Sequence, residues 1–359
     1  MRTGSRMEQS MAQWFKNGRW RRPVSWLLGV ALLAVVAFYA VPALLVDRRA
    51  PVRLVVYAFS TQEAAFDQGI FPAFEQAWAT QTGQLVTIEG VFGASGTLAG
   101  QINLGAPADV AVFSNAEHVD WLKLGKRVRR DTQPAIIGCT PMVVVVRPGN
   151  PFQIAKYPDL AQPGLKLLHA DPRSSGAGEW GVLAEYGSAY LPSQDEAAGR
   201  SQLEDIWGNV RLLADSAREA MSLFELGAGD ALVTYEQDAV AAQQRGIGLD
   251  IVNAPRTIIA QHAAVIVDDN VTRVERSVAE GFVSFLLSSA GQQVFSRFHM
   301  RPPTCQGDAF PALVEPFAVK DLGGWSQAYA DLVDGLWKQQ IESNLNLAPA
   351  PQVPRTGEP

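Results

Sequence analysis

The sequence contains few of the side chains that usually carry catalysis or metal binding. Its 359 residues include two cysteines and four histidines, with no Cys-x-x-Cys pair and no His-Glu-x-x-His motif. There is no G-x-S-x-G nucleophile turn and no G-x-x-x-x-G-K-S/T phosphate loop. We therefore predict a protein without enzyme activity, metal or cofactor, in which the histidines serve core or surface packing: His118, His169, His262 and His299.

The chain also lacks an excess of positive charge. It has 30 Lys and Arg against 36 Asp and Glu, a formal net charge of −6. Eight of the basic residues lie within residues 1–52, so the remainder holds 22 basic and 34 acidic residues and carries −12. A surface of this sign repels nucleic acid, and we expect no such partner. A bound anion would have to be held by local dipoles.

Charge is absent altogether from residues 24–46, a run of 23 residues. This length spans a bilayer and exceeds the apolar core of an ordinary signal peptide. Three arginines precede it, which favours a cytoplasmic N-terminus. We predict a membrane anchor at 24–46 that leaves the body of the protein on the periplasmic or extracytoplasmic face. A cleaved signal peptide is the alternative.

From residue 53 on, short apolar runs alternate with segments of helical spacing. Residues 53–57 are predicted as a buried strand and residues 66–81 as a helix, with Phe66, Ile70, Phe74 and Trp78 at four-residue steps. Strands that alternate with helices indicate an α/β fold with a parallel sheet. The last segment, 346–359, contains four prolines and is predicted to be disordered.

Two strand ends are followed by turns rich in serine, glycine and alanine. One reads D-P-R-S-S-G-A-G-E-W at 171–180, and the other reads V-F-G-A-S-G-T-L-A-G at 91–100. A helix start offers unpaired N–H groups, and small residues let an anion approach them. Ser60, Ser95 and Ser175 all fall at strand ends, where α/β sheets bind ligands. An ordinary serine cap with nothing bound is the alternative.

Taken together, these turns resemble the periplasmic sulfate-binding proteins of ABC importers, a class related to molybdate- and tungstate-binding proteins. The resemblance covers residues 53–342. It rests on the order and spacing of these motifs: G-A-S-G-T at 93–97, G-A-P-A-D-V at 105–110, V-R-P-G-N-P at 146–151, S-S-G-A-G-E-W at 174–180, D-S-A-R at 215–218, G-D-A-L-V-T-Y-E at 229–236, R-P at 301–302 and G-G-W at 323–325.

The resemblance implies a two-lobed periplasmic binding protein-like fold of type 2, closing over a tetrahedral oxyanion that is passed to an ABC permease with its ATPase. Chain order places lobe one at 53–138 and 263–310, and lobe two at 139–262. A C-terminal helical segment follows at 311–345. The residues that match the family's anion donors are Ser60, Ser95, Ser175, Gly176, Ala177, Ala217 and Tyr235.

Several departures from the family leave the anion open among sulfate, thiosulfate, molybdate and tungstate. Phe59 stands where sulfate binders have an aspartate, and Tyr235 stands where they have tryptophan. We expect phosphate to bind poorly, because no acid is clearly aimed inward, although Asp171 and Glu179 are close in sequence. A membrane-anchored sensor or assembly protein with the same fold is the rival function.

Three further expectations concern single residues. Cys139 and Cys305 form either a disulfide or two buried thiols, and chain order places both near the hinge between the lobes. Alanine at Ser95 or at Ser175 is expected to weaken anion binding. We expect neither change to affect the stability of the ligand-free protein.

Overall fold

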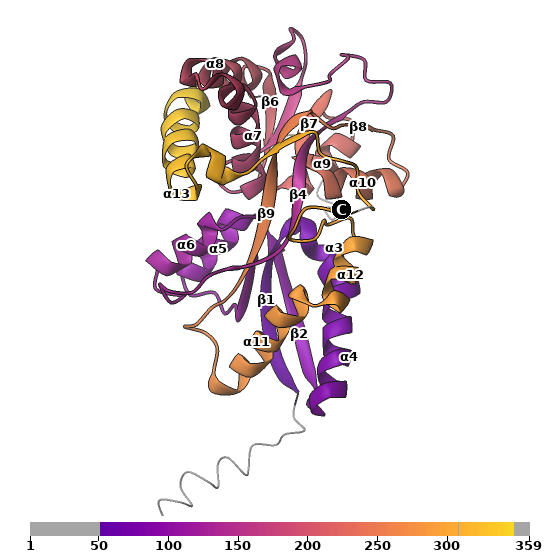
Figure 1. Ribbon diagram of the computed structural model, residues 1–359, viewed down its shortest axis with the longest axis vertical. Coiled ribbons are helices and arrows are strands. Elements are labelled where there is room, and N and C mark those ends of the chain that lie inside the picture. The colour runs from indigo at the N-terminus through magenta and orange to yellow at the C-terminus, as the bar shows by residue number, and fades with distance from the viewer. Residues whose placement is uncertain (1–50, 308, 348–359) are drawn as a thin grey trace, which may run out of the picture. The chain divides into compact units, whose positions relative to one another are not determined.

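The computed structural model describes residues 51–307 and 309–347, and the chain from Val52 on forms one compact unit (Figure 1). The anchor predicted at 24–46 lies outside the described residues, as does most of the predicted tail at 346–359. Within the described part, every helix is too short or too polar to cross a bilayer.

The centre of the unit is a ten-stranded mixed sheet in the order β2-β1-β3-β9-β4-β7-β5-β6, with β10 paired to β9 and β8 to β4. The strands are β1 (Val52–Phe59), β2 (Val86–Gly93), β3 (Val110–Phe113), β4 (Ala135–Val146), β5 (Leu167–Ala170), β6 (Val210–Ala214), β7 (Ala231–Tyr235), β8 (Asp250–Val252), β9 (Arg256–Ile266) and β10 (Glu315–Phe317).

Two groups of parallel strands make up this sheet. β1 pairs in parallel with β2 and β3, and β5 pairs in parallel with β6 and β7. The long strands β4 and β9 are antiparallel to each other and join the two groups, β9 through β3 and β4 through β7 (Figure 1). The α/β prediction is confirmed, but the sheet is mixed because β9 runs against β3 and β4 runs against β7.

Helices connect the strands of each group. They are α3 (Glu63–Ala65), α4 (Phe71–Thr82), α5 (Ser95–Asn103), α6 (Glu117–Leu124), α7 (Gly176–Ser193), α8 (Glu196–Trp207), α9 (Ala217–Glu225), α10 (Glu236–Gln244), α11 (Arg273–Leu287), α12 (Ser289–Arg297) and α13 (Trp325–Ala328). Short turns η1 (Ser60–Gln62), η3 (Tyr157–Ala161), η4 (Val319–Leu322) and η6 (Glu342–Asn344), with the π-helical segments η2 (Phe66–Ile70) and η5 (Tyr329–Ile341), complete the described chain.

The helix predicted at 66–81 begins with the π-helical turn η2 and continues as α4. Phe66, Ile70 and Phe74 are buried, as their four-residue spacing predicted. The ring of Phe74 lies 5.2 Å from that of Phe282 on α11, so these helices pack on one face of β1 and β2. Gly83 ends the helix with φ of 70°, a left-handed conformation that suits glycine.

A second set of contacts fixes the C-terminal part of the chain to β4. Cys139 and Cys305 are joined by a disulfide with Cα atoms 5.7 Å apart. Next to it, Cys139 and Arg301 exchange backbone hydrogen bonds of 3.0 and 3.1 Å. The buried Arg301 guanidinium binds both carboxylate oxygens of Glu236 at 2.7 Å. The segment after α12 is therefore held at the middle of the sheet.

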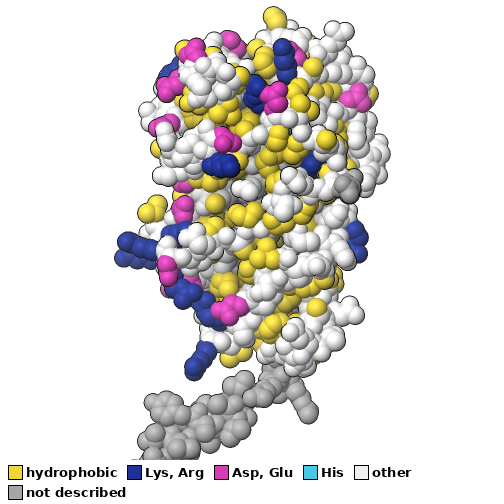
Figure 2. All heavy atoms as spheres, viewed as in Figure 1, with side chains coloured by type: hydrophobic (Ala, Val, Ile, Leu, Met, Phe, Trp, Pro, Cys, Tyr) yellow, Lys and Arg dark blue, Asp and Glu magenta, His cyan; other side chains and the backbone are white. Residues whose placement is uncertain are grey.

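Many surface cations have carboxylates beside them. Figure 2 shows dark blue side chains at its left edge, in the region of α6. The basic residues on and after α6 include Lys123, Arg127 and Arg129, and each of these three is ion-paired, to Asp120, Asp269 and Asp268 respectively. The positive charge of this group is therefore partly neutralised by neighbouring carboxylates.

Candidate functional site

The residues predicted to bind an anion lie at the carboxyl ends of five strands. Ser60 follows β1, Ser95 begins α5 after β2, Ser175 caps α7 after β5, Ala217 begins α9 after β6, and Tyr235 ends β7. All of them are buried, together with Gly176 and Ala177. The N-terminal ends of five helices or turns therefore lie at the carboxyl edge of the sheet.

Direct hydrogen bonds bring three of these helix starts together. At the start of α5, the N–H groups of Gly96 and Thr97 donate to the carbonyl of Ser174, at 2.8 and 3.3 Å. The Ser174 hydroxyl in turn donates to the carbonyl of Asp215, just before α9, at 2.8 Å. The starts of α5, α7 and α9 are therefore neighbours, although their first residues are far apart in sequence.

The side chains that follow β3 leave no room for a Cβ atom at position 176. A Cβ atom added to Gly176 would fall 1.7 Å from Ser114 Oγ and 2.9 Å from Asn115 Nδ2. Ser114 and Asn115 follow directly after β3. The indole of Trp180, on the same helix, donates to the carbonyl of Ser114 at 2.9 Å. The first turn of α7 is thus packed against the end of β3, and an alanine at 176 would displace the Ser114 side chain.

The first residues of α7 and α9 keep free donors. Gly176, Ala177 and Ala217 have no intrahelical acceptor for their N–H groups, because they open their helices. No other acceptor in residues 51–307 and 309–347 binds these groups. Helix starts also carry roughly half a positive charge each. This arrangement can hold an anion with backbone dipoles alone.

Ser95 is held by a chain of buried hydrogen bonds. Its Oγ accepts from the N–H of Ser114 at 3.0 Å and lies 2.9 Å from His118 Nδ1. His118 Nε2 lies 3.1 Å from Glu179 Oε1, and Asn115 Nδ2 donates to Glu179 Oε2 at 2.5 Å. Both oxygens of the Glu179 carboxylate are thus occupied by groups on and before α6.

Within residues 51–307 and 309–347, three buried polar atoms beside this chain make no protein hydrogen bond of ordinary geometry: Ser114 Oγ, Tyr235 OH and His262 Nε2. The Ser114 hydroxyl nevertheless lies near enough to Tyr235 to influence its phenol. The His262 ring lies 4.6 Å from that of Phe59 and 5.5 Å from that of Tyr235, so Phe59 helps to enclose the group. Buried polar atoms normally find partners, so this cluster has donors and acceptors available for ordered water or for a bound molecule.

The protonation of this cluster follows from its burial. Burial raises the pKa of Tyr235 well above its ordinary value, with the nearby Ser114 hydroxyl lowering it in part, so the phenol remains a donor. Burial lowers the pKa of His262 to about 4. Its Nδ1 lies 3.1 Å from the Ser114 carbonyl, which only accepts, so Nδ1 carries the hydrogen and Nε2 offers a lone pair.

Charged side chains near the site are already paired. Arg218, next to Ala217, lies 3.3 Å from Glu63 at α3. Arg173 forms ion pairs with Asp171 and with Glu342. The Asp171 carboxylate is therefore already engaged and is not free to accept a proton from a bound anion. The Glu179 carboxylate, which the sequence left undecided, is buried and faces His118. The site therefore consists mainly of neutral donors.

Sequence reasoning missed Ser114, Asn115, His118 and His262. The first two could have been found, because they follow the strand at 110–113 just as Ser60 follows the first strand. The histidines had been assigned to packing, and His169 and His299 remain outside the site, where they lie 2.8 Å from Glu185 and 3.0 Å from Gln244. No local motif marks His118 or His262.

Comparison with known proteins agrees with this geometry. Residues 54–301 match the family described as bacterial extracellular solute-binding protein. A protein named sulfate-binding protein from Synechococcus elongatus is 30% identical, with 81% of this chain and 87% of the relative covered. The sulfate-binding protein of Escherichia coli is 31% identical over 71% of this chain and 82% of its own length.

Two further similarities bear on ligand and fold. A thiosulfate-binding protein of Pseudomonas aeruginosa is 28% identical, covering 76% of this chain and 87% of the relative. Among solved structures, the sulfate-binding protein SubI from Mycobacterium tuberculosis matches with a TM-score of 0.72 and 27% identity, covering 78% of this chain and 99% of that one. The two-lobed fold expected from the sequence is thereby confirmed.

Proposed function

The chain belongs to the family of bacterial extracellular solute-binding proteins, and from this premise we propose that it captures sulfate, or a similar tetrahedral oxyanion, and delivers it to an ABC importer. The observation that carries the proposal is the meeting of the α5, α7 and α9 starts beside unpartnered buried hydroxyls. Hydrogen bonds to a charged acceptor are each stronger than those to a neutral one.

The anion would be held by the free N–H groups of Gly176, Ala177 and Ala217, together with the hydroxyls of Ser114 and Tyr235. Ser95 and Ser175 lie beside these donors, and Ser60 opens η1 near α9. Because these donors come from both strand groups, an anion between them would draw the groups together. Lobe closure of this kind is the working step of such a protein.

The lobe boundaries remain part of the proposal. We place the crossings between lobe one (53–138 and 263–310) and lobe two (139–262) on β4 and β9, where Cys139 pairs with Gln261. The disulfide would then pin the C-terminal segment at the hinge. We also propose that residues 24–46 anchor the protein in the inner membrane, with the binding unit in the periplasm.

Titration calorimetry of the binding unit, residues 52–359, against sulfate, thiosulfate, molybdate, tungstate and phosphate tests the proposal. We expect saturable binding of sulfate and much weaker binding of phosphate, which keeps a proton and needs an acceptor. Thiosulfate is the second candidate, in view of the named relative. Equal affinity for phosphate would contradict a site in which donors dominate, and would indicate that the lone pair of His262 Nε2 accepts the phosphate proton.

A further inference from the structure

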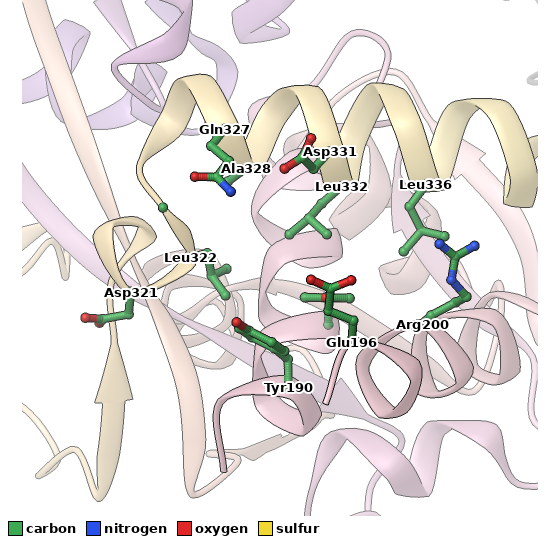
Figure 3. Close-up of a pocket in the computed structure, with 12 residues that line it drawn as sticks. Tyr190, Glu196, Arg200, Asp321, Leu322, Gln327, Ala328, Asp331, Leu332 and Leu336 are labelled. Atoms are coloured by element: carbon green, nitrogen blue, oxygen red, sulfur yellow. The ribbon is translucent and has the colours of Figure 1, made fainter. Parts of the chain in front are cut away.

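A second pocket lies between the far end of α7, the first turns of α8 and the C-terminal segment, with a volume of about 360 Å³ (Figure 3). Tyr186, which lines it, is ten residues along α7 from Gly176, so about 15 Å of helix separates the pocket from the candidate anion site. The residues of the two places do not overlap. The pocket therefore needs an explanation of its own.

The pocket is lined by three acids and by an apolar group of leucines, and Leu332 and Leu336 come from the same helix as Asp331 (Figure 3). Figure 3 shows Glu196 and Asp331 on opposite sides of the opening, with Asp321 at one end and Arg200 at the other. The Arg200 guanidinium is already engaged by the side-chain oxygen of Gln340. The apolar surface comes from three leucines: Leu322, Leu332 and Leu336.

A nearly buried tyrosine points to a ligand independently of the acids. Tyr186 is 7% exposed as a whole, and its hydroxyl, which makes no hydrogen bond within residues 51–307 and 309–347, is not fully shielded from solvent. Burial, followed by the charge of Glu196, raises the pKa of Tyr186 to about 12, so the phenol is neutral and lies in the field of the carboxylates. Its ring stacks on Tyr190, with centroids 5.4 Å apart and planes inclined by 27°. The π-face of such a stack attracts cations.

The chemistry of the walls selects the class of ligand. Across the described residues, no three acidic, histidine or cysteine side chains are close enough together to hold a metal ion. Carboxylates that are spread along a pocket with an apolar leucine surface suit an elongated molecule that carries both charge and an apolar stem. We propose that this pocket binds an organic cation, an ammonium or guanidinium group on an aliphatic stem. The stem packs on the leucines while the charge lies between Glu196, Asp331 and the tyrosines.

The cation has two possible sources, a free amine or an arginine or lysine side chain of a polypeptide. Agmatine and N-acetyl-arginine methylamide represent the two, and N-acetyl-norleucine methylamide is the neutral control. Binding of the full-length protein to each is followed by calorimetry at low and at high salt. We expect saturation by one or both cations at or below about 1 mM, and weaker binding at high salt because partly exposed charge pairs are screened.

Variants then assign the binding to this pocket. Glu196→Gln and Asp331→Asn should each weaken cation binding by about 3- to 10-fold, the scale of a partly exposed charge contact. Asp205→Asn is the matched control, because Asp205 is an exposed acid on the same helix α8 that does not line the pocket. Tyr186→Phe, which keeps the ring, tests the hydroxyl alone.

Three results would overturn the proposal: no saturable binding of either cation, equal binding of the neutral control, or an equal loss in Asp205→Asn. Sulfate affinity, measured on the same variants, should stay unchanged. Failure of sulfate binding in every sample would contradict the proposed function and leave the cation result standing, so the two are tested separately.

Discussion

Alanine substitutions at Ser95 and Ser175 should separate a structural serine from one that serves only the ligand. The Ser95 hydroxyl is bound internally, to the N–H of Ser114 and to Nδ1 of His118. The Ser175 hydroxyl caps α7 by position only and makes no side-chain hydrogen bond to the helix. From the sequence we expected neither substitution to affect stability. With these contacts, we expect the Ser95 substitution to destabilise the ligand-free protein and the Ser175 substitution to leave it unchanged.

The magnitude follows from the groups that each substitution leaves behind. Ser95→Ala leaves a buried N–H and a buried ring nitrogen without their partner, which should cost about 1–3 kcal/mol of unfolding free energy without ligand. Ser175→Ala leaves no such group, so the unfolding free energy should change by less than about 0.5 kcal/mol. If each residue also donates to the anion, its loss raises the Kd for sulfate by about 5- to 150-fold.

Chemical denaturation of the ligand-free variants and calorimetry with sulfate measure the two effects separately. Equal unfolding midpoints for Ser95→Ala and the parent protein would refute the internal role of Ser95. A large loss of stability in Ser175→Ala with unchanged sulfate affinity would show that this serine is only a helix cap.

Four further perturbations follow from the same contacts. Tyr235→Phe removes a buried hydroxyl that makes no hydrogen bond of ordinary geometry within the described residues and lies near the Ser114 hydroxyl, so it should change the stability of the ligand-free protein by less than about 1 kcal/mol while weakening sulfate binding, as paired denaturation and calorimetry will show. His262 has a folded pKa of about 4 against 6.5 unfolded, so the unfolded state binds more protons and stability is lost as pH falls from about 6.5 to 4. As pH falls across this window, the unfolding free energy of the parent should fall by up to about 3 kcal/mol more than that of His262→Phe. Parallel plots of unfolding free energy against pH for the two proteins would contradict the lowered pKa of His262. Glu179→Ala leaves the buried Asn115 Nδ2 and His118 Nε2 without their acceptor, so it should lower the free energy of unfolding by about 3–5 kcal/mol. Glu179→Gln should lower it by less in the same denaturation assay. Reduction of the Cys139–Cys305 disulfide, which spans 166 residues, should cost about 4–5 kcal/mol in the chain-entropy model, and two titratable thiols in the denatured, unreduced protein would show that the bond does not form.

The elements of the fold and most of the candidate site were accessible from sequence because their signals are local. The four-residue steps of Phe66, Ile70 and Phe74 marked a helix whose buried face the structure reproduces. The glycine-rich turns around Ser95 and Ser175 marked helix starts, since small residues and caps act on their own neighbours in the chain. For Cys139 and Cys305 the sequence left two alternatives, a disulfide or two buried thiols, and the structure shows the disulfide.

The partners of these residues were decided only by the tertiary structure. Glu179 reads in sequence as an acid in the first turn of a helix, where a solvated carboxylate is stabilised by the helix dipole. Packing of α7 against the end of β3 removes it from water and places it against His118, 61 residues away. His262, in the middle of a β-strand, carries no local signal, and only the approach of Phe59 and Tyr235 buries its ring. Chain-local preferences set where strands end and helices begin, whereas burial and hydrogen-bond partners depend on segments that meet only after folding.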